Sequence, residues 1–213
     1  MGGVASPLRA NVYLHRYIEA FRRAGFGERY GAVLVNYADD FVVLCRREAS
    51  AVLEATRRKM AEIGLALNEA KTCVRDARRE SFQFLGYTFG PMYWPRNGRR
   101  YLGAAPSRKA ITQAKGHVRG LLSPGNQAPW EEVRERLNRL LQGWANYFCY
   151  GTLTKARREV QRYVWDRVRS FLRRRRHGAA RESRRYSEAR VFGEMGVLSL
   201  WRCPRVGYAN ALS

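Results

Sequence analysis

The sequence predicts an α+β fold, with helices and antiparallel strands in its first part and mainly helices in its second. Three observations predict this class. β-branched residues fill "AVLVNYADDFVVLCR", residues 32–46. Apolar residues recur at helical spacing on both sides of that run, and Pro and Gly interrupt both patterns in residues 91–106. We therefore expect a sheet-containing part, a connector over residues 91–106 and a helical part.

The first part should begin with a helix over residues 8–24, which Gly25 ends. Its apolar residues fall on one face: Leu14, Tyr17, Ile18 and Phe21. Two strands should follow and flank a two-residue connection, Ala38-Asp39. A second helix is expected over residues 49–64, with an inward stripe of Val52, Leu53, Thr56, Met60 and Ile63. Short strands are expected at residues 65–67, 72–75 and 82–89.

The second part should hold three main helices. Ser107 can cap the first, over residues 108–122, Pro129 opens the second and Thr154 starts the third. The inward stripe of the second is Val133, Leu137, Leu140, Leu141, Trp144 and Phe148, and Tyr147, at helical spacing with Trp144 and Phe148, should also belong mainly to the core. The inward stripe of the third is Val160, Tyr163, Val164, Val168, Phe171 and Leu172. The basic residues from 178 onward look irregular, with short strands expected within residues 196–203.

Composition indicates a polyanionic partner. The chain has 213 residues, of which 46% are hydrophobic, and its 40 Lys and Arg against 18 Asp and Glu give a net charge of +22. Such an excess is typical of nucleic-acid binding. The four cysteines are scattered, which indicates neither a disulfide framework nor a zinc site and fits a reducing compartment. No apolar run is long enough to span a bilayer.

Two adjacent carboxylates, Asp39 and Asp40, interrupt the apolar strand pair. Burying an unpaired charge is costly, so the pair should lie at the apex of a hairpin, exposed to solvent or to a metal ion. Asp is also a good turn residue, and a turn role is an equal alternative for either one alone. Divalent ions such as Mg²⁺ prefer carboxylate oxygens, and in a basic protein this pair is typical of nucleotidyl transfer.

Several short segments resemble a known family in order along the chain. "YADD", Tyr37–Asp40, resembles the catalytic hairpin of reverse transcriptases, and "GGVASPL", Gly2–Leu8, resembles the end of the motif before the palm helix. "GLALNEAKT" (64–72), "FQFLGYTF" (82–89) and "LLQGWANYF" (140–148) resemble the triphosphate-side motif, the primer-gripping hairpin and the maturase X domain. The chain as a whole resembles group II intron-encoded reverse transcriptase/maturases.

This resemblance implies a partial reverse-transcriptase palm over residues 1–90 and a helical thumb or X domain over residues 107–177. Residues 178–213 would be its basic tail. Asp39 and Asp40 would be catalytic ligands of Mg²⁺, and Lys71 would lie near the triphosphate, although it could be a plain surface lysine. The implied substrate- or primer-binding residues are Gly2, Gly3, Ser6, Pro7, Tyr37, Ala38, Leu85, Gly86 and Tyr87. Residues 85–87 could equally be an ordinary hairpin.

The chain also departs from the family pattern. No Asp precedes Asp39, whereas the family carries another metal-binding Asp on an earlier palm strand, and Met1 stands where the family has Gln. We expect a chain that begins inside a motif and that, alone, is not a competent polymerase. A separate N-terminal half is therefore an expected partner.

The region from Lys155 to Arg190 has more than three basic residues for each acidic one. Guanidinium groups suit phosphate oxygens and stack on unpaired bases. We expect arginines on its outer faces to bind RNA: Arg157, Arg158, Arg162, Arg169, Arg173, Arg174, Arg175 and Arg176. The arginines at the end of the helix also favour its negative dipole end, so part of their role can be structural.

Three hypotheses follow. The chain is part of a polymerase and maturase that acts on group II intron RNA, an RNA template and a DNA primer. Alternatively, it is a non-catalytic RNA-binding splicing factor, or an inactive remnant that needs the separate half. We expect a cytoplasmic, nucleic-acid-associated bacterial protein without a membrane partner.

Overall fold

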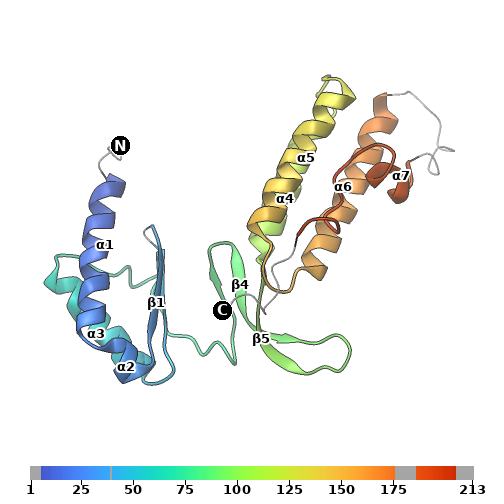
Figure 1. The fold of residues 1–213 in the computed structure, drawn as a ribbon. Helices are drawn as coiled ribbons and strands as arrows, with labels where there is room; N and C mark the ends of the chain where they lie inside the picture. Colours follow the sequence, from blue (N-terminus) through green and yellow to red (C-terminus); the bar gives the residue numbers. More distant parts are fainter. Residues whose placement is uncertain (1–5, 39, 176–185, 205–213) are drawn as a thin grey trace. The chain divides into compact units, whose positions relative to one another are not determined.

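The computed structural model describes residues 6–38, 40–175 and 186–204. The chain forms two compact units, Met1–Asp76 and Ala77–Ser213. Each contains helices and a small antiparallel sheet (Figure 1). The α+β class predicted from the sequence is therefore confirmed.

Within the described residues, the first unit combines three helices with a two-stranded sheet. Its elements are α1 (Ser6–Arg23), α2 (Phe26–Tyr30), β1 (Val33–Tyr37), β2 (Asp40–Leu44) and α3 (Ala49–Glu62). Tyr17 of α1 is fully buried, and its hydroxyl lies 3.0 Å from that of Thr56 in α3. Burial raises the pKa of this tyrosine. The rings of Phe21 and Phe26 stack with centroids 4.7 Å apart. The predicted apolar face of the first helix therefore forms the core of the unit.

Strands β1 and β2 form the predicted hairpin. Their pairing runs from Val33 opposite Leu44 to Tyr37 opposite Asp40, which leaves Ala38-Asp39 as the two-residue connection. Alternate residues face opposite sides of a strand, so Leu34, Phe41 and Val43 pack on the core. On the other side Val42 is half-buried, and the remaining residues are exposed: Val33, Val35, Tyr37, Asp40 and Leu44.

Two features of the first unit differ from the prediction. Residues 65–67 and 72–75 do not form strands. Thr72 instead donates from both its amide and its hydroxyl to the carbonyl of Asn68, each at 2.9 Å, which closes a turn. The short helix α2 was not predicted; Gly25 and Gly31, with φ of 65° and 57°, enclose it.

The second unit begins with a three-stranded antiparallel sheet in the order β3-β4-β5, made of β3 (Phe82–Phe84), β4 (Tyr87–Tyr93) and β5 (Arg100–Pro106). The prediction of a connector over residues 91–106 is wrong, because most of these residues belong to the β4–β5 hairpin. Pro91 is compatible with β4 because β3 pairs only as far as Phe89 on that strand. Pro91 therefore lies where β4 has a free edge.

In the described part of the chain, four helices complete the second unit: α4 (Arg108–Leu121), α5 (Trp130–Tyr147), α6 (Thr154–Arg175) and α7 (Glu188–Phe192). The hydroxyl of Ser107 accepts from the amide of Ala110 at 3.1 Å, so the predicted cap of α4 is confirmed. The fully buried side chains of the core include Val118, Val133, Leu137, Val160, Val164 and Val168. The predicted stripes of α5 and α6 thus pack against each other and against α4.

Residues 196–203 form no strand, contrary to the prediction. Side chains of the helices take the place of a strand partner. Asn138 of α5 donates to the carbonyl of Gly196 at 2.8 Å and accepts from the amide of Leu198 at 2.7 Å. Gln161 of α6 accepts from the amide of Leu200 at 2.9 Å. The segment therefore lies along the helices rather than in a sheet.

Within the described ranges, no helix is both long and apolar enough to cross a membrane.

Candidate nucleic-acid interface

The β1–β2 hairpin places the predicted catalytic carboxylates at its exposed end. Tyr37 and Asp40 are the last pair of the ladder and lie on the face that points away from the core. The side chain of Tyr37 is 64% exposed, and Asp40 is exposed as well. Ala38 adopts a positive φ of 48°, which a tight hairpin turn requires. Asp39 lies outside the described residues.

The donor chemistry of this hairpin fits a divalent cation in part. Asp40 offers carboxylate oxygens at an accessible position, and Asp39 adjoins it in sequence. Among the described residues, no three His, Cys, Asp or Glu side chains gather closely enough to hold a metal ion. The described residues thus do not test the ligand assignment, and Asp39 and Asp40 stay the predicted ligands.

Lys71 lies in the loop that follows α3. Its amide donates to the carbonyl of Asn68 at 2.9 Å, and its side chain is exposed. Glu69 of the same loop accepts from Arg57 of α3 in a paired contact of 3.0 and 2.7 Å. This ion pair lowers the pKa of Glu69 and attaches the loop to the helix. The described contacts do not join Lys71 to Asp40, and its place near the triphosphate stays a prediction.

The segment expected to contact substrate at the start of the chain is only partly described. Ser6 and Pro7 begin α1, where proline suits the first turn because it needs no amide donor there. Gly2 and Gly3 lie outside the described residues.

The turn between β3 and β4 is tied to the C-terminal end of α5. Leu85 and Gly86 have φ of 49° and 74°, the backbone of a primed hairpin turn, which is unfavourable for leucine. The Tyr147 hydroxyl donates to the Leu85 carbonyl at 3.0 Å, and the Ser107 amide donates to that of Gly86 at 2.8 Å. The Tyr87 hydroxyl donates to the Tyr147 carbonyl at 2.9 Å. These reciprocal bonds offset the strain and fix the turn.

This arrangement reveals a role for Tyr147 that the helical spacing did not predict. The spacing assigned Tyr147 to the core together with Trp144 and Phe148, whereas 55% of its side chain is exposed. Its contact residues lie about sixty positions earlier in the chain. The only sequence signal for this role is the hydroxyl group that Tyr147 carries between the aromatic residues Trp144 and Phe148. Primer contact by Leu85, Gly86 and Tyr87 stays a prediction.

The prediction that Arg157 lies on an outer face is wrong. Its side chain is fully buried, and its guanidinium donates to the carbonyls of Leu200, Cys203 and Pro204 at 2.9, 2.9 and 2.7 Å. A buried guanidinium needs such partners because its desolvation is costly. Arg157 therefore fixes the segment after α7 and does not contact RNA in this fold.

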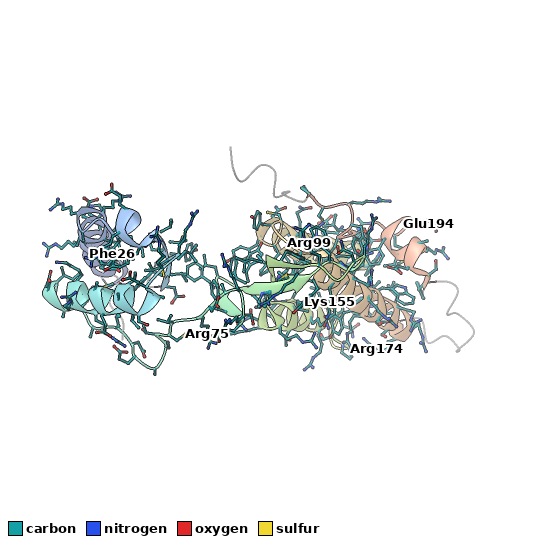
Figure 2. All side chains as sticks on the ribbon, turned by 90° about the horizontal axis from the view of Figure 1, so that it is seen from below. Phe26, Arg75, Arg99, Lys155, Arg174 and Glu194 are labelled. Atoms are coloured by element: carbon teal, nitrogen blue, oxygen red, sulfur yellow. The ribbon has the colours of Figure 1, made fainter. Side chains whose placement is uncertain are left out.

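The other predicted arginines of α6 differ in exposure. Arg158, Arg162, Arg173 and Arg174 are exposed, whereas Arg169 is partly buried over the ring of Trp165 at 4.9 Å. Arg175 donates to the carbonyl of Asn126 at 2.7 Å. Arg176 lies outside the described residues. Figure 2 shows Lys155 and Arg174 near opposite ends of α6, so basic side chains extend along the helix.

The one acidic side chain in the first half of α6, Glu159, is neutralised by neighbours. Lys115 of α4 donates to it at 2.6 Å and Arg108 contacts it at 3.2 Å. The hydrogen bond from Lys115 holds the pKa of Glu159 below its usual range. The surface formed by α4 and α6 thus keeps an excess of positive charge.

Two protein-family models match the chain. One, described as reverse transcriptase (RNA-dependent DNA polymerase), matches residues 1–89. The other, described as group II intron, maturase-specific domain, matches residues 111–188. The chain belongs to the group II intron reverse transcriptase/maturases. The family and the reverse transcriptase/maturase function predicted from the motifs are therefore confirmed. No curated protein sequence matches the chain.

Membership of this reverse transcriptase/maturase family brings two general properties. Reverse transcriptases act on nucleic acid with divalent metal ions, and maturase domains act on intron RNA. The reverse transcriptase match ends at residue 89, whereas the first compact unit ends at Asp76. Strand β3 therefore belongs to the matched reverse transcriptase region and to the second compact unit.

Proposed function

We propose that this reverse transcriptase/maturase binds its group II intron RNA through the helical surface of its second unit. The observation that carries the proposal is that α6 buries apolar side chains and exposes basic ones. Its apolar stripe forms part of the core, where Val160, Val164 and Val168 are all fully buried. Arg158 and Arg162 remain exposed on the same helix. A rigid basic surface of this kind suits structured RNA, which proteins recognise by shape and backbone.

The RNA affinity of the chain should then depend strongly on salt. Each phosphate that a protein cation neutralises releases counterions, so the logarithm of the affinity falls linearly with that of the salt concentration. Arg158→Gln and Arg162→Gln should each reduce this slope by about one. Arg157→Met should leave this slope unchanged when the variant is folded. A salt-independent affinity would contradict the proposal.

The first unit contributes the polymerase chemistry in this proposal. Asp39 and Asp40 would hold Mg²⁺ at the end of the β1–β2 hairpin, where Asp40 is accessible. The ion supplies charge stabilisation during attack by the primer hydroxyl on the incoming nucleotide. The RNA template, the DNA primer and a separate N-terminal half are the partners that this activity would need.

Primer extension on an RNA template with Mg²⁺, by the chain combined with a separate N-terminal half, tests the assignment of Asp39 and Asp40. The Asp39→Ala, Asp40→Ala variant should lose extension but keep its RNA affinity within about twofold. A matched control is Glu28→Ala, Glu62→Ala, which removes two exposed carboxylates of the same unit and should leave extension unchanged. Extension that persists without Asp39 and Asp40 would show that the ligand assignment is wrong.

A non-catalytic splicing factor is the second candidate. Among the described residues, the helical core of the second unit lies between Ile111 and Cys203. This core needs no side chain from the β1–β2 hairpin. RNA binding by this unit can therefore assist splicing without any polymerase chemistry. Salt-sensitive RNA binding without extension, even when the separate N-terminal half is supplied, would favour this candidate. We expect a cytoplasmic location under either proposal.

A further inference from the structure

A small hollow of about 260 Å³ lies on the second unit, between α6, α7 and the segment after α7 that carries Trp201. Figure 1 shows α7 and that segment lying alongside α6. Its lining combines cationic, aromatic and hydrogen-bonding side chains: Arg158, Gln161, Arg162, Trp165, Glu188 and Trp201. The four from α6 share one helical face, because they are three or four residues apart. We call this site the Trp201 hollow.

The wall that carries Trp201 is held in place by two buried polar side chains. Gln161 is only 4% exposed, and its oxygen accepts from the Leu200 amide at 2.9 Å and the Ser199 hydroxyl at 3.2 Å. Arg157 binds the carbonyls on both sides of Trp201, as described above. The backbone is thus fixed at Leu200, directly before Trp201, and at Cys203, two residues after it. Such preorganisation lowers the entropy lost when a ligand binds.

The opposite wall is fixed as well. The indole N–H of Trp165 donates to the carbonyl of Tyr186 at 2.8 Å, and Arg169 lies over the same ring. Gln161 also donates to Glu188 at 3.3 Å. The Trp165 ring and the backbone near Trp201 are therefore fixed, and Trp201 exposes 40% of its surface.

The chemistry of the lining matches one nucleotide better than a bare phosphate. An indole stacks on any nucleobase, and guanidinium groups bind the phosphate of the same nucleotide. Glu188 would repel a phosphate but can accept from the amino or imino hydrogens of a base edge. The volume suits a single base, and bases within an A-form helix are already stacked and paired.

We propose that the Trp201 hollow binds one unpaired nucleotide of the intron RNA. This proposal rests on the RNA binding proposed above and adds a recognition element to it. Trp201 lies beyond residues 111–188, the part that the maturase-specific model matches. The nucleotide would stack on Trp201, with its phosphate near Arg158 and Arg162 and its base edge toward Glu188.

The test compares a short single-stranded RNA with a fully paired RNA of the same length, using the whole chain. Trp201→Ala should weaken binding of the single strand about tenfold, since loss of base stacking is costly. It should change binding of the duplex by less than twofold. Trp201→Phe keeps an aromatic face and should recover most of the loss. Trp94→Ala, at a tryptophan that is 51% exposed on the β4–β5 hairpin, is the matched control.

Each outcome has a distinct meaning. Equal losses on single strand and duplex, or no loss on either, would overturn the hollow as a base site. Photo-crosslinking of a 4-thiouridine-labelled single strand should identify Trp201 or its neighbours, and crosslinks confined to other segments would also overturn it. Competition by polyglutamate as effective as that by RNA would show a general anion surface instead. If RNA bound with no salt dependence, the underlying RNA-binding proposal itself would fail.

Discussion

At the scale of single residues, Arg157 shows that an arginine in a basic helix can serve the core. Its guanidinium satisfies three carbonyls of residues 200–204 in a fully buried place. Removing it would leave those carbonyls without these donors and create a cavity. Arg157→Ala should therefore lower the free energy of unfolding by about 3 kcal/mol or more, as measured by urea denaturation.

Arg158 gives the matched control for this prediction. It adjoins Arg157 in sequence but is exposed, so Arg158→Ala should change stability by no more than about 0.5 kcal/mol. The same variant should weaken RNA binding. Equal stabilities of the two variants would refute the positioning role of Arg157.

The ion pair between Glu159 and Lys115 should make the stability of the chain depend on pH. The hydrogen bond from Lys115 lowers the pKa of Glu159 in the folded state from the usual value of 4.5. A lowered carboxyl pKa means that the stabilisation is fully present above pH 4.5 and is lost as pH falls through the folded-state pKa. The stability difference between the parent and Glu159→Gln, measured by denaturation from pH 7 downward, should therefore shrink below pH 4.5. A difference that does not vary with pH would exclude this ion pair as its source.

At the scale of elements, the β3–β4 turn depends on Gly86. Its φ is +74°, and a Cβ there would lie 3.3 Å from the ring of Phe148. Gly86→Ala should therefore destabilise the chain by about 1–2 kcal/mol. Gly143→Ala is the control: Gly143 lies inside α5, and a Cβ there would meet nothing within 4 Å. It should stabilise by about 0.5–1 kcal/mol, since alanine favours helices. Thermal denaturation of both variants checks the opposite signs.

The elements that the sequence predicted correctly are those that local pattern determines. The Ala38-Asp39 turn follows from the residues that flank it, and the helix stripes follow from their spacing. Pro91 misled the prediction because its tolerance depends on where β3 stops pairing, a long-range fact. Residues 196–203 have the apolar pattern of a strand, but the amides and carbonyls there pair with Asn138, Gln161 and Arg157 instead.

At the scale of the whole molecule, the motifs identified the family, but the roles of individual side chains depended on tertiary packing. The exposed hairpin end at Tyr37 and Asp40 was predictable because charged residues avoid burial. Arg157 and Arg158 could not be told apart by composition, because only the path of the segment after α7 makes one of them buried. The same path places Trp201 beside α6, so no local pattern could have shown the Trp201 hollow.

The two compact units have separate cores, which predicts two unfolding transitions. The core of the first includes Met60, and that of the second includes Leu137. Met60→Ala and Leu137→Ala should each cost about 2–5 kcal/mol of unfolding free energy in their own unit. Calorimetry should show each variant lowering a different transition by about 8 °C or more, with the other transition unchanged. If both variants shifted one common transition, the units would unfold cooperatively, and the helical unit could not serve as an independent RNA-binding body.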